Sequence, residues 1–210
     1  MTVSSRSTDV THVPNQQERS AADMLKQAHR TWGGKEDLWV FGYASLIWRP
    51  EFHADEQREA RVHGWHRALK MQSRAHRGTP ETPGLVFALM AGGCCRGMAY
   101  RIHKDRAAEE LTRLWEREMP NSVYDPKWLP CLTPQGKVKA LAFTLSRRSP
   151  QFVGHLPDPA LLSILRTAKG GFGTTLDYLL ETASSLRKYG IHDREIERLM
   201  ALLGGLPQGE

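Results

Sequence analysis

Glu118 is the residue whose type and position most clearly suggest proton-transfer chemistry. The segment 107–119 predicts a helix, and at about 100° per residue Glu118 falls on the same apolar face as Leu111. Of the carboxylates on this helix, Glu118 alone is expected to point inward. Burial raises the pKa of a carboxyl group and makes it a useful general base near neutral pH. The alternative is a helix that ends near Arg117, which would leave Glu118 in solvent.

A second candidate is the segment 41–48, in which small residues lie between apolar ones where a strand runs into a loop. Consecutive backbone N–H groups in such a loop can bind a carboxylate or a phosphate. Gly42 lacks the later Gly and Lys of a phosphate-binding P-loop. Ser45 lacks the G-x-S-x-G surroundings of a hydrolase nucleophile. The alternative is an ordinary junction between a strand and a turn.

Tyr178 is a third candidate, in the first turn of a helix predicted over Thr175–Lys188. A glycine-rich segment, 170–173, precedes this helix, and Thr174 and Asp177 have the spacing of a capping box. The predicted core stripe comprises Leu176, Leu179, Leu180 and Ala183. Tyr178 lies off that stripe, where its hydroxyl could face a cleft at the helix N-terminus. The alternative is a partly exposed surface tyrosine.

The segment 49–77 is rich in arginine and histidine, which invites comparison with nucleic-acid-binding proteins. It contains no recognised DNA- or RNA-binding motif, and its histidines lack metal-ligand spacing. We expect it to form a solvated basic face.

These residues need elements to position them, and the pattern predicts strands early and helices late. Strands are predicted at 38–43, 62–71, 85–90, 97–102 and 138–145, with 85–90 and 97–102 forming a hairpin around Gly92 and Gly93. Helices are predicted at 20–29, 107–119, 159–168, Thr175–Lys188 and 193–203, with Asp158 as the cap of the third. This order favours an α+β fold. We expect an N-terminal tail at 1–37 containing the first helix, one domain at 38–203, and a short tail at 204–210.

Composition narrows the class of protein. The 210 residues carry a net charge of +6, which is modest for a nucleic-acid-binding protein. No apolar stretch is long enough for a membrane span, and the N-terminus lacks the pattern of a signal peptide. The 3 cysteines cannot form a disulfide framework, which favours a reducing, cytoplasmic location.

Taken together, the segments resemble ChaC-type glutathione-specific γ-glutamylcyclotransferases. Residues 39–48, WVFGYASLIW, are similar to the F-G-Y-G-S-L-[IM]-W of that family, and GTTLDYL at 173–179 is similar to G-T-N-x-x-Y-L. Further matches are 64–68, 77–79, 83–84, 97–101, 114–119, Tyr124 and Trp128. The resemblance extends over residues 38–189, and the order and spacing of its parts make it specific.

The resemblance implies a small, mixed, barrel-like β-sheet flanked by helices, and cleavage of glutathione to 5-oxoproline and cysteinylglycine. It implies that Glu118 is the acid/base residue. It implies that the substrate is bound by Tyr43, Ala44, Ser45, Leu46, Tyr124 and Tyr178. No metal or organic cofactor, nucleic acid or membrane is implied, and we expect a monomer or a weak homodimer.

Two positions depart from the family pattern. Ala44 stands where the family usually has Gly, so its methyl group would strain the loop if a positive φ is needed, or would narrow the pocket. Thr175 stands where the family usually has Asn, which removes an amide that could orient the helix start or the ligand. The alternatives are a different γ-glutamyl substrate, a protein that binds γ-glutamyl compounds without turnover, and a nucleic-acid-binding protein.

Overall fold

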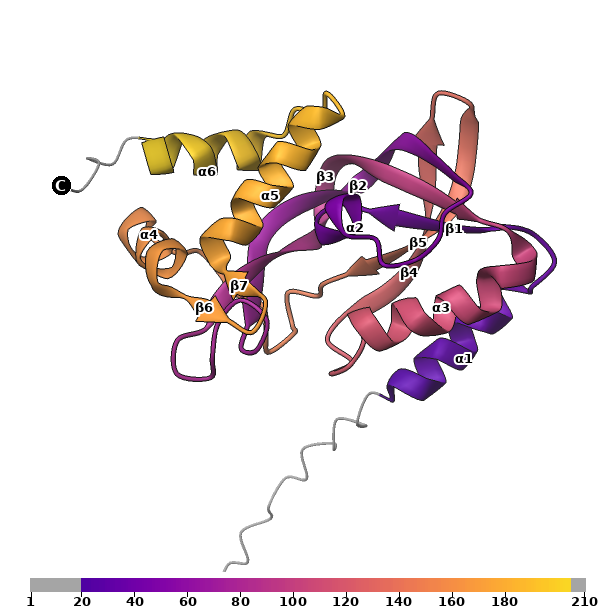
Figure 1. Ribbon diagram of the computed structural model, residues 1–210, viewed down its shortest axis with the longest axis horizontal. Helices are drawn as coiled ribbons and strands as arrows, with labels where there is room; N and C mark the ends of the chain where they lie inside the picture. The colour runs from indigo at the N-terminus through magenta and orange to yellow at the C-terminus, as the bar shows by residue number, and fades with distance from the viewer. Residues whose placement is uncertain (1–19, 205–210) are drawn as a thin grey trace, which may run out of the picture.

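Five strands close into a barrel at the centre of the molecule, in the order β1-β3-β2-β4-β5 with a further β3–β5 pairing (Figure 1). The strands are β1 Leu38–Gly42, β2 Glu56–Ser73, β3 Gly84–Ile102, β4 Asp125–Thr133 and β5 Gly136–Thr144. Strand β5 runs parallel to β1 and β3, and the other pairings are antiparallel. The sheet is therefore mixed, as expected. This computed structural model describes residues 20–204, so the predicted tail ends at 1–19 and 205–210 lie outside the described residues.

Helices cover the barrel on two sides (Figure 1). They are α1 Ala21–Trp32, α2 Ser45–Trp48, α3 Lys104–Glu118, α4 Asp158–Thr167, α5 Thr175–Lys188 and α6 Arg194–Gly204. Helices α1 and α3 lie together on one side, while α4, α5 and α6 gather on the other with the small β6–β7 ribbon, Lys169–Gly170 and Gly173–Thr174. The predicted α+β class is confirmed.

The predicted hairpin between 85–90 and 97–102 is wrong, because both segments belong to the single long strand β3. Strand β3 pairs antiparallel with β2, and the register shifts between His63 and Trp65. Gly64, Gly92 and Gly93 have positive φ at this irregularity. The glycine pair thus forms a bulge that bends the strand, whereas the prediction took it as a turn that reverses the chain.

Three smaller expectations also differ. Strand β4 was not predicted, because Pro126 and Pro130 within it argue against a strand. Helix α4 has Pro157 as its N-cap, and Asp158 lies in the first turn without capping it. Leu180 is exposed on α5 instead of belonging to the core stripe.

The predicted first helix is confirmed and extends to Trp32. The Ser20 hydroxyl caps it by accepting from the Asp23 N–H at 3.2 Å, and Gly33 ends it in the left-handed conformation. The Trp115 indole donates to the Ala21 carbonyl at 2.8 Å, which ties α1 to α3. Among residues 20–204, no helix is long and apolar enough to cross a membrane.

Candidate active site

Helix α3 places Glu118 at its last residue, beside the face that packs on the barrel. The buried stripe of this helix includes Ala107, Leu111, Leu114 and Trp115. The Glu118 side chain is 14% exposed, whereas that of Glu109 is 67% exposed. The expectation that Glu118 alone is turned inward is wrong, because Glu110 is also buried. What separates the two carboxylates is that Glu118 lines a cavity.

Two opposing influences act on the Glu118 carboxyl. Burial raises its pKa above the usual range, and this is the largest effect. The Arg117 guanidinium lies 3.0 Å from Oε1 and partly offsets burial by favouring the ionised form. Arg117 also pairs with Glu51 at 3.0 Å, and its side chain is itself largely buried. The net result is a carboxyl group with a raised pKa that keeps one cationic neighbour.

The site loop, residues 43–46, joins the end of β1 to the start of α2. A Cβ at Gly42 would lie 3.0 Å from both Leu46 Cβ and the Tyr100 ring, so only glycine lets β1 turn here without displacement. Ala44 has a negative φ of −144°, so its methyl group causes no positive-φ strain. That methyl group lines the cavity instead.

Arg67 supports the site loop from behind. Its guanidinium donates to the carbonyl oxygens of Tyr43 and Arg96 and pairs with Asp193. The Arg67 side chain is fully buried, so the expected solvated basic face is wrong at this position. The prediction failed because Asp193 lies far along the chain, and its approach is set by tertiary packing alone.

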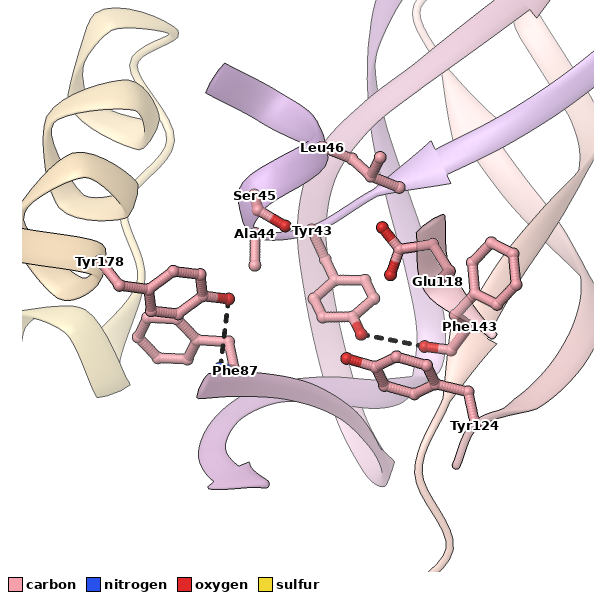
Figure 2. A pocket seen from close by; sticks show the side chains of 9 residues that line it. All are labelled: Tyr43, Ala44, Ser45, Leu46, Phe87, Glu118, Tyr124, Phe143 and Tyr178. Carbon is pink, nitrogen blue, oxygen red and sulfur yellow. Dashed lines mark hydrogen bonds between the residues drawn. The ribbon is translucent and has the colours of Figure 1, made fainter. Parts of the chain in front are cut away.

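Three buried tyrosines complete the walls. The Tyr43 hydroxyl donates to the Phe143 carbonyl at 3.0 Å, and the Tyr124 hydroxyl lies beside it (Figure 2). The Tyr178 hydroxyl accepts from the Phe87 N–H at 3.3 Å. Burial raises the pKa of all three hydroxyls, so they stay protonated and can donate hydrogen bonds. Tyr178 is 5% exposed, so the surface alternative for it is wrong.

Every residue predicted for the site lines one narrow cavity, shown in Figure 2. Its lining comprises Tyr43, Ala44, Ser45, Leu46, Phe87, Glu118, Tyr124, Phe143 and Tyr178. Phe87 and Phe143 were missed, because nothing in their local sequence separates them from ordinary core residues.

The narrow cavity meets a wide cleft of about 600 Å³. Ser45, Glu118, Tyr124 and Tyr178 line both, so Glu118 lies where the two spaces join. The arginines of the cleft are Arg49, Arg74, Arg77 and Arg117. Sequence reasoning missed Arg77 and Arg117 as site residues. The only signal for Arg77 was its place in the resembling segment 77–79, and for Arg117 its position next to Glu118.

Thr175 does not reach the cavity, because it is completely buried beneath the loop that carries Arg77. Its hydroxyl donates to the Arg77 carbonyl at 3.1 Å and accepts from the Leu85 N–H at 3.2 Å. The predicted capping box of Thr174 and Asp177 is confirmed at the start of the same helix. Threonine therefore orients the helix start here in place of the expected amide.

The arrangement suits a reaction that moves a proton within one bound molecule. A carboxyl group with a raised pKa can take a proton from an amine and return it to a neighbouring nitrogen. Ser45 and Leu46 lie in the first turn of α2, where backbone N–H groups have no acceptor within the helix. The arginines of the wide cleft suit an anionic compound.

Comparisons with known proteins agree with this geometry. The profile of the ChaC-like protein family matches residues 38–205. A glutathione-specific γ-glutamylcyclotransferase of Escherichia coli is 34% identical over 164 residues, covering 78% of this chain and 71% of the relative. A human glutathione-specific γ-glutamylcyclotransferase 1 is 32% identical over 182 residues, covering 84% and 82%. The crystal structure of a yeast γ-glutamyl cyclotransferase specific to glutathione has the same fold, with a TM-score of 0.73 at 21% identity, covering 81% of this chain and 96% of that one.

Proposed function

The chain belongs to the ChaC-like family, and from that premise we propose that it is a glutathione-specific γ-glutamylcyclotransferase. In this reaction the α-amine of the γ-glutamyl residue attacks its own γ-carbonyl carbon. A five-membered lactam closes, the amide bond to cysteine breaks, and the products are 5-oxoproline and cysteinylglycine. Because the attack is intramolecular, the enzyme mainly holds the substrate in a reactive shape and moves protons.

Glu118 is the proposed acid/base residue. The substrate amine arrives as an ammonium group and must lose a proton before it can attack. The Glu118 carboxylate takes that proton, and the amine nitrogen then bonds to the γ-carbon. The protonated Glu118 next gives the proton to the departing cysteine nitrogen. The attacking nitrogen still carries one hydrogen more than the lactam keeps, and Glu118 passes this second proton to the same departing nitrogen, so cysteinylglycine leaves as an ammonium. All the hydrogens of the two nitrogens are then accounted for, and Glu118 ends ionised, ready for another turnover.

The two joined spaces are suited to bind two different parts of the substrate. The narrow cavity takes the γ-glutamyl group, and the wide cleft takes the cysteinylglycine part. Backbone N–H groups of the site loop hold the α-carboxylate or the developing oxyanion. Tyr178 and Tyr124, whose raised pKa values keep their hydroxyls protonated, position the γ-glutamyl group.

The proposal also covers the cofactors, partners and cellular location of the enzyme. Proton transfer by one carboxylate requires no metal or organic cofactor, and the substrate is the only partner that the chemistry needs. We propose that the enzyme acts in the cytoplasm as a monomer or a weak homodimer.

One observation carries the proposal: a buried carboxyl group of raised pKa lies at the junction of a narrow cavity and an arginine-lined cleft. The test is incubation of the purified protein with glutathione and direct measurement of both products. Equal amounts of 5-oxoproline and cysteinylglycine are expected. Tight binding of glutathione with no product over hours would instead indicate a protein that binds γ-glutamyl compounds.

A further inference from the structure

Arg77 is a buried guanidinium that no part of the proposed reaction yet uses. The residue is 8% exposed and lines the wide cleft. Among residues 20–204, the one hydrogen bond from the guanidinium goes to the Thr174 carbonyl at 3.5 Å, the outer limit for such a bond. Asp177 and Glu181 are the carboxylates that influence it, and within residues 20–204 neither forms an ion pair with it.

The other arginines of the cleft either pair with carboxylates or are exposed. Arg117 pairs with Glu51 and Glu118, and Arg49 pairs with Glu51 at 2.5 Å. Arg74 is exposed and donates to the Gln72 side chain at 2.9 Å. Within the described part of the chain, Arg77 is therefore the cleft arginine that combines burial with the lack of an ion pair.

The surroundings of Arg77 hold it firmly in this position. Its N–H donates to the Ser73 hydroxyl at 3.0 Å, and its carbonyl accepts from Thr175. The next residue, Gly78, packs so closely that an added Cβ would lie 2.0 Å from the Gly84 nitrogen. The guanidinium carbon lies 5.3 Å from the centre of the Tyr178 ring and 5.9 Å from that of Trp48.

A buried cation that forms no close ion pair is costly, and a bound anion can offset that cost. Burial lowers the pKa of the Arg77 guanidinium, so its charge is disfavoured where it lies. A fixed, planar guanidinium is well suited to bind a carboxylate with two parallel hydrogen bonds.

We propose that Arg77 binds the C-terminal glycine carboxylate of the substrate and so selects a γ-glutamyl dipeptide tail that ends in a free acid. This inference rests on the proposed function and deepens it by assigning a specificity residue.

The position of Arg77 favours the glycine carboxylate over the α-carboxylate of the substrate. Arg77 lines the wide cleft and not the narrow cavity that holds the reacting groups. Tyr178 borders both spaces and lies across the narrow cavity from Glu118 (Figure 2), while its ring contacts Arg77. Two residues of extended peptide span about 7 Å, so the cysteinylglycine tail can carry its carboxylate past this ring.

The test compares glutathione with its glycine amide, which keeps the shape of the substrate but removes the carboxylate charge. The wild-type enzyme is expected to lose about 10- to 100-fold in kcat/KM on the amide, mostly through KM, since the contact is remote from the reacting atoms. On glutathione, Arg77→Met should have a kcat/KM lower than that of the wild type by a similar factor. On the amide, its kcat/KM should be close to the wild-type value for the amide. Arg77→Lys should keep part of the preference for glutathione, because it keeps a charge without the planar geometry.

Arg113→Met is the control, because Arg113 is an exposed arginine on α3 that does not line the cleft. It should retain the wild-type preference for glutathione over the amide. Equal turnover of the two compounds by the wild-type enzyme would overturn the inference without any variant. So would equal losses from Arg77→Met on both compounds, which is the result expected of a purely structural residue. If wild-type enzyme releases no 5-oxoproline from glutathione, the proposed function falls, and the inference falls with it.

Discussion

At the scale of single residues, Glu118 shows what local sequence can and cannot predict. Its inward direction follows from helix periodicity alone, because α3 forms over nearly the expected range. Periodicity does not separate Glu118 from the buried Glu110, because the cavity beside Glu118 is built by the site loop, α5, Tyr124 and strands β3 and β5 of the barrel. Arg67 and Arg77 were beyond prediction for the same reason, since their burial depends on partners distant in the chain.

Replacing Glu118 with Gln should separate activity from stability. Loss of the acid/base group is expected to lower kcat by about 10²- to 10⁴-fold. Because the folded-state pKa of Glu118 is raised, its ionised form destabilises the fold, and this effect grows as pH rises through the folded pKa. Glu118→Gln should therefore raise Tm at neutral pH and have less effect in acid.

The measurements are product release and thermal unfolding at two pH values. A variant with near-normal turnover would remove Glu118 from the proposed role. A variant that is less stable at neutral pH than the wild type would contradict the account of its burial.

Arg117 should set the acid limb of the pH profile. Its guanidinium favours ionised Glu118, so removing it should raise the pKa of Glu118 further. In Arg117→Met, the acid limb of kcat/KM should therefore move to higher pH. Arg113→Met is the control, because Arg113 lies on the same helix but is exposed and pairs with Glu109. A limb that stays in place or moves to lower pH in Arg117→Met would contradict this coupling.

At the scale of elements, the loop between β1 and α2 depends on segments that lie far from it in sequence. Arg67 on β2 joins the Tyr43 carbonyl to Asp193, the residue just before α6. Asp193 Oδ1 in turn accepts from the N–H groups of Glu195 and Ile196, so one carboxylate both caps α6 and neutralises Arg67. Helix boundaries such as Thr175–Lys188 could be predicted from local caps, whereas this long-range connection could not.

Breaking the Arg67–Asp193 pair should destabilise the fold strongly. Removal of one member of a buried pair leaves the other uncompensated and costs about 3–5 kcal/mol. Arg67→Met and Asp193→Asn should each approach that cost in urea denaturation. The double variant should cost less than the sum of the two, because the lone charge is no longer left behind. The exposed pair of Arg113 with Glu109 provides the comparison, with an expected cost of at most about 1 kcal/mol.

At the scale of the whole molecule, part of the net positive charge is concentrated at the wide cleft. The net charge of +6 initially invited a nucleic-acid interpretation. Arginines from several elements instead converge on the wide cleft, where the proposed substrate is an anion. The cleft also carries Glu51, Glu116 and Glu118, so the arginines leave only a small positive excess. Such an excess modestly favours the approach of an anionic substrate. Net charge alone could not predict this, because the convergence depends on how the barrel closes.

The barrel also decides which thiols can react, and this gives a test of the whole fold. Cys94 is exposed, while Cys95 and Cys131 are buried. Cys94 and Cys95 differ in exposure because neighbouring side chains of strand β3 point to opposite faces of the sheet. Burial raises the pKa of Cys95 to about 11 and that of Cys131 to about 12, so neither forms much thiolate at neutral pH.

Native protein should therefore show one rapidly reacting thiol with a thiol-specific reagent, and Cys94→Ser should abolish that phase. The other two thiols should react only as fast as the protein unfolds, and urea should make them accessible together. Rapid modification of Cys95 or Cys131 in the native protein would mean that the barrel opens far more readily than its closed hydrogen bonding implies.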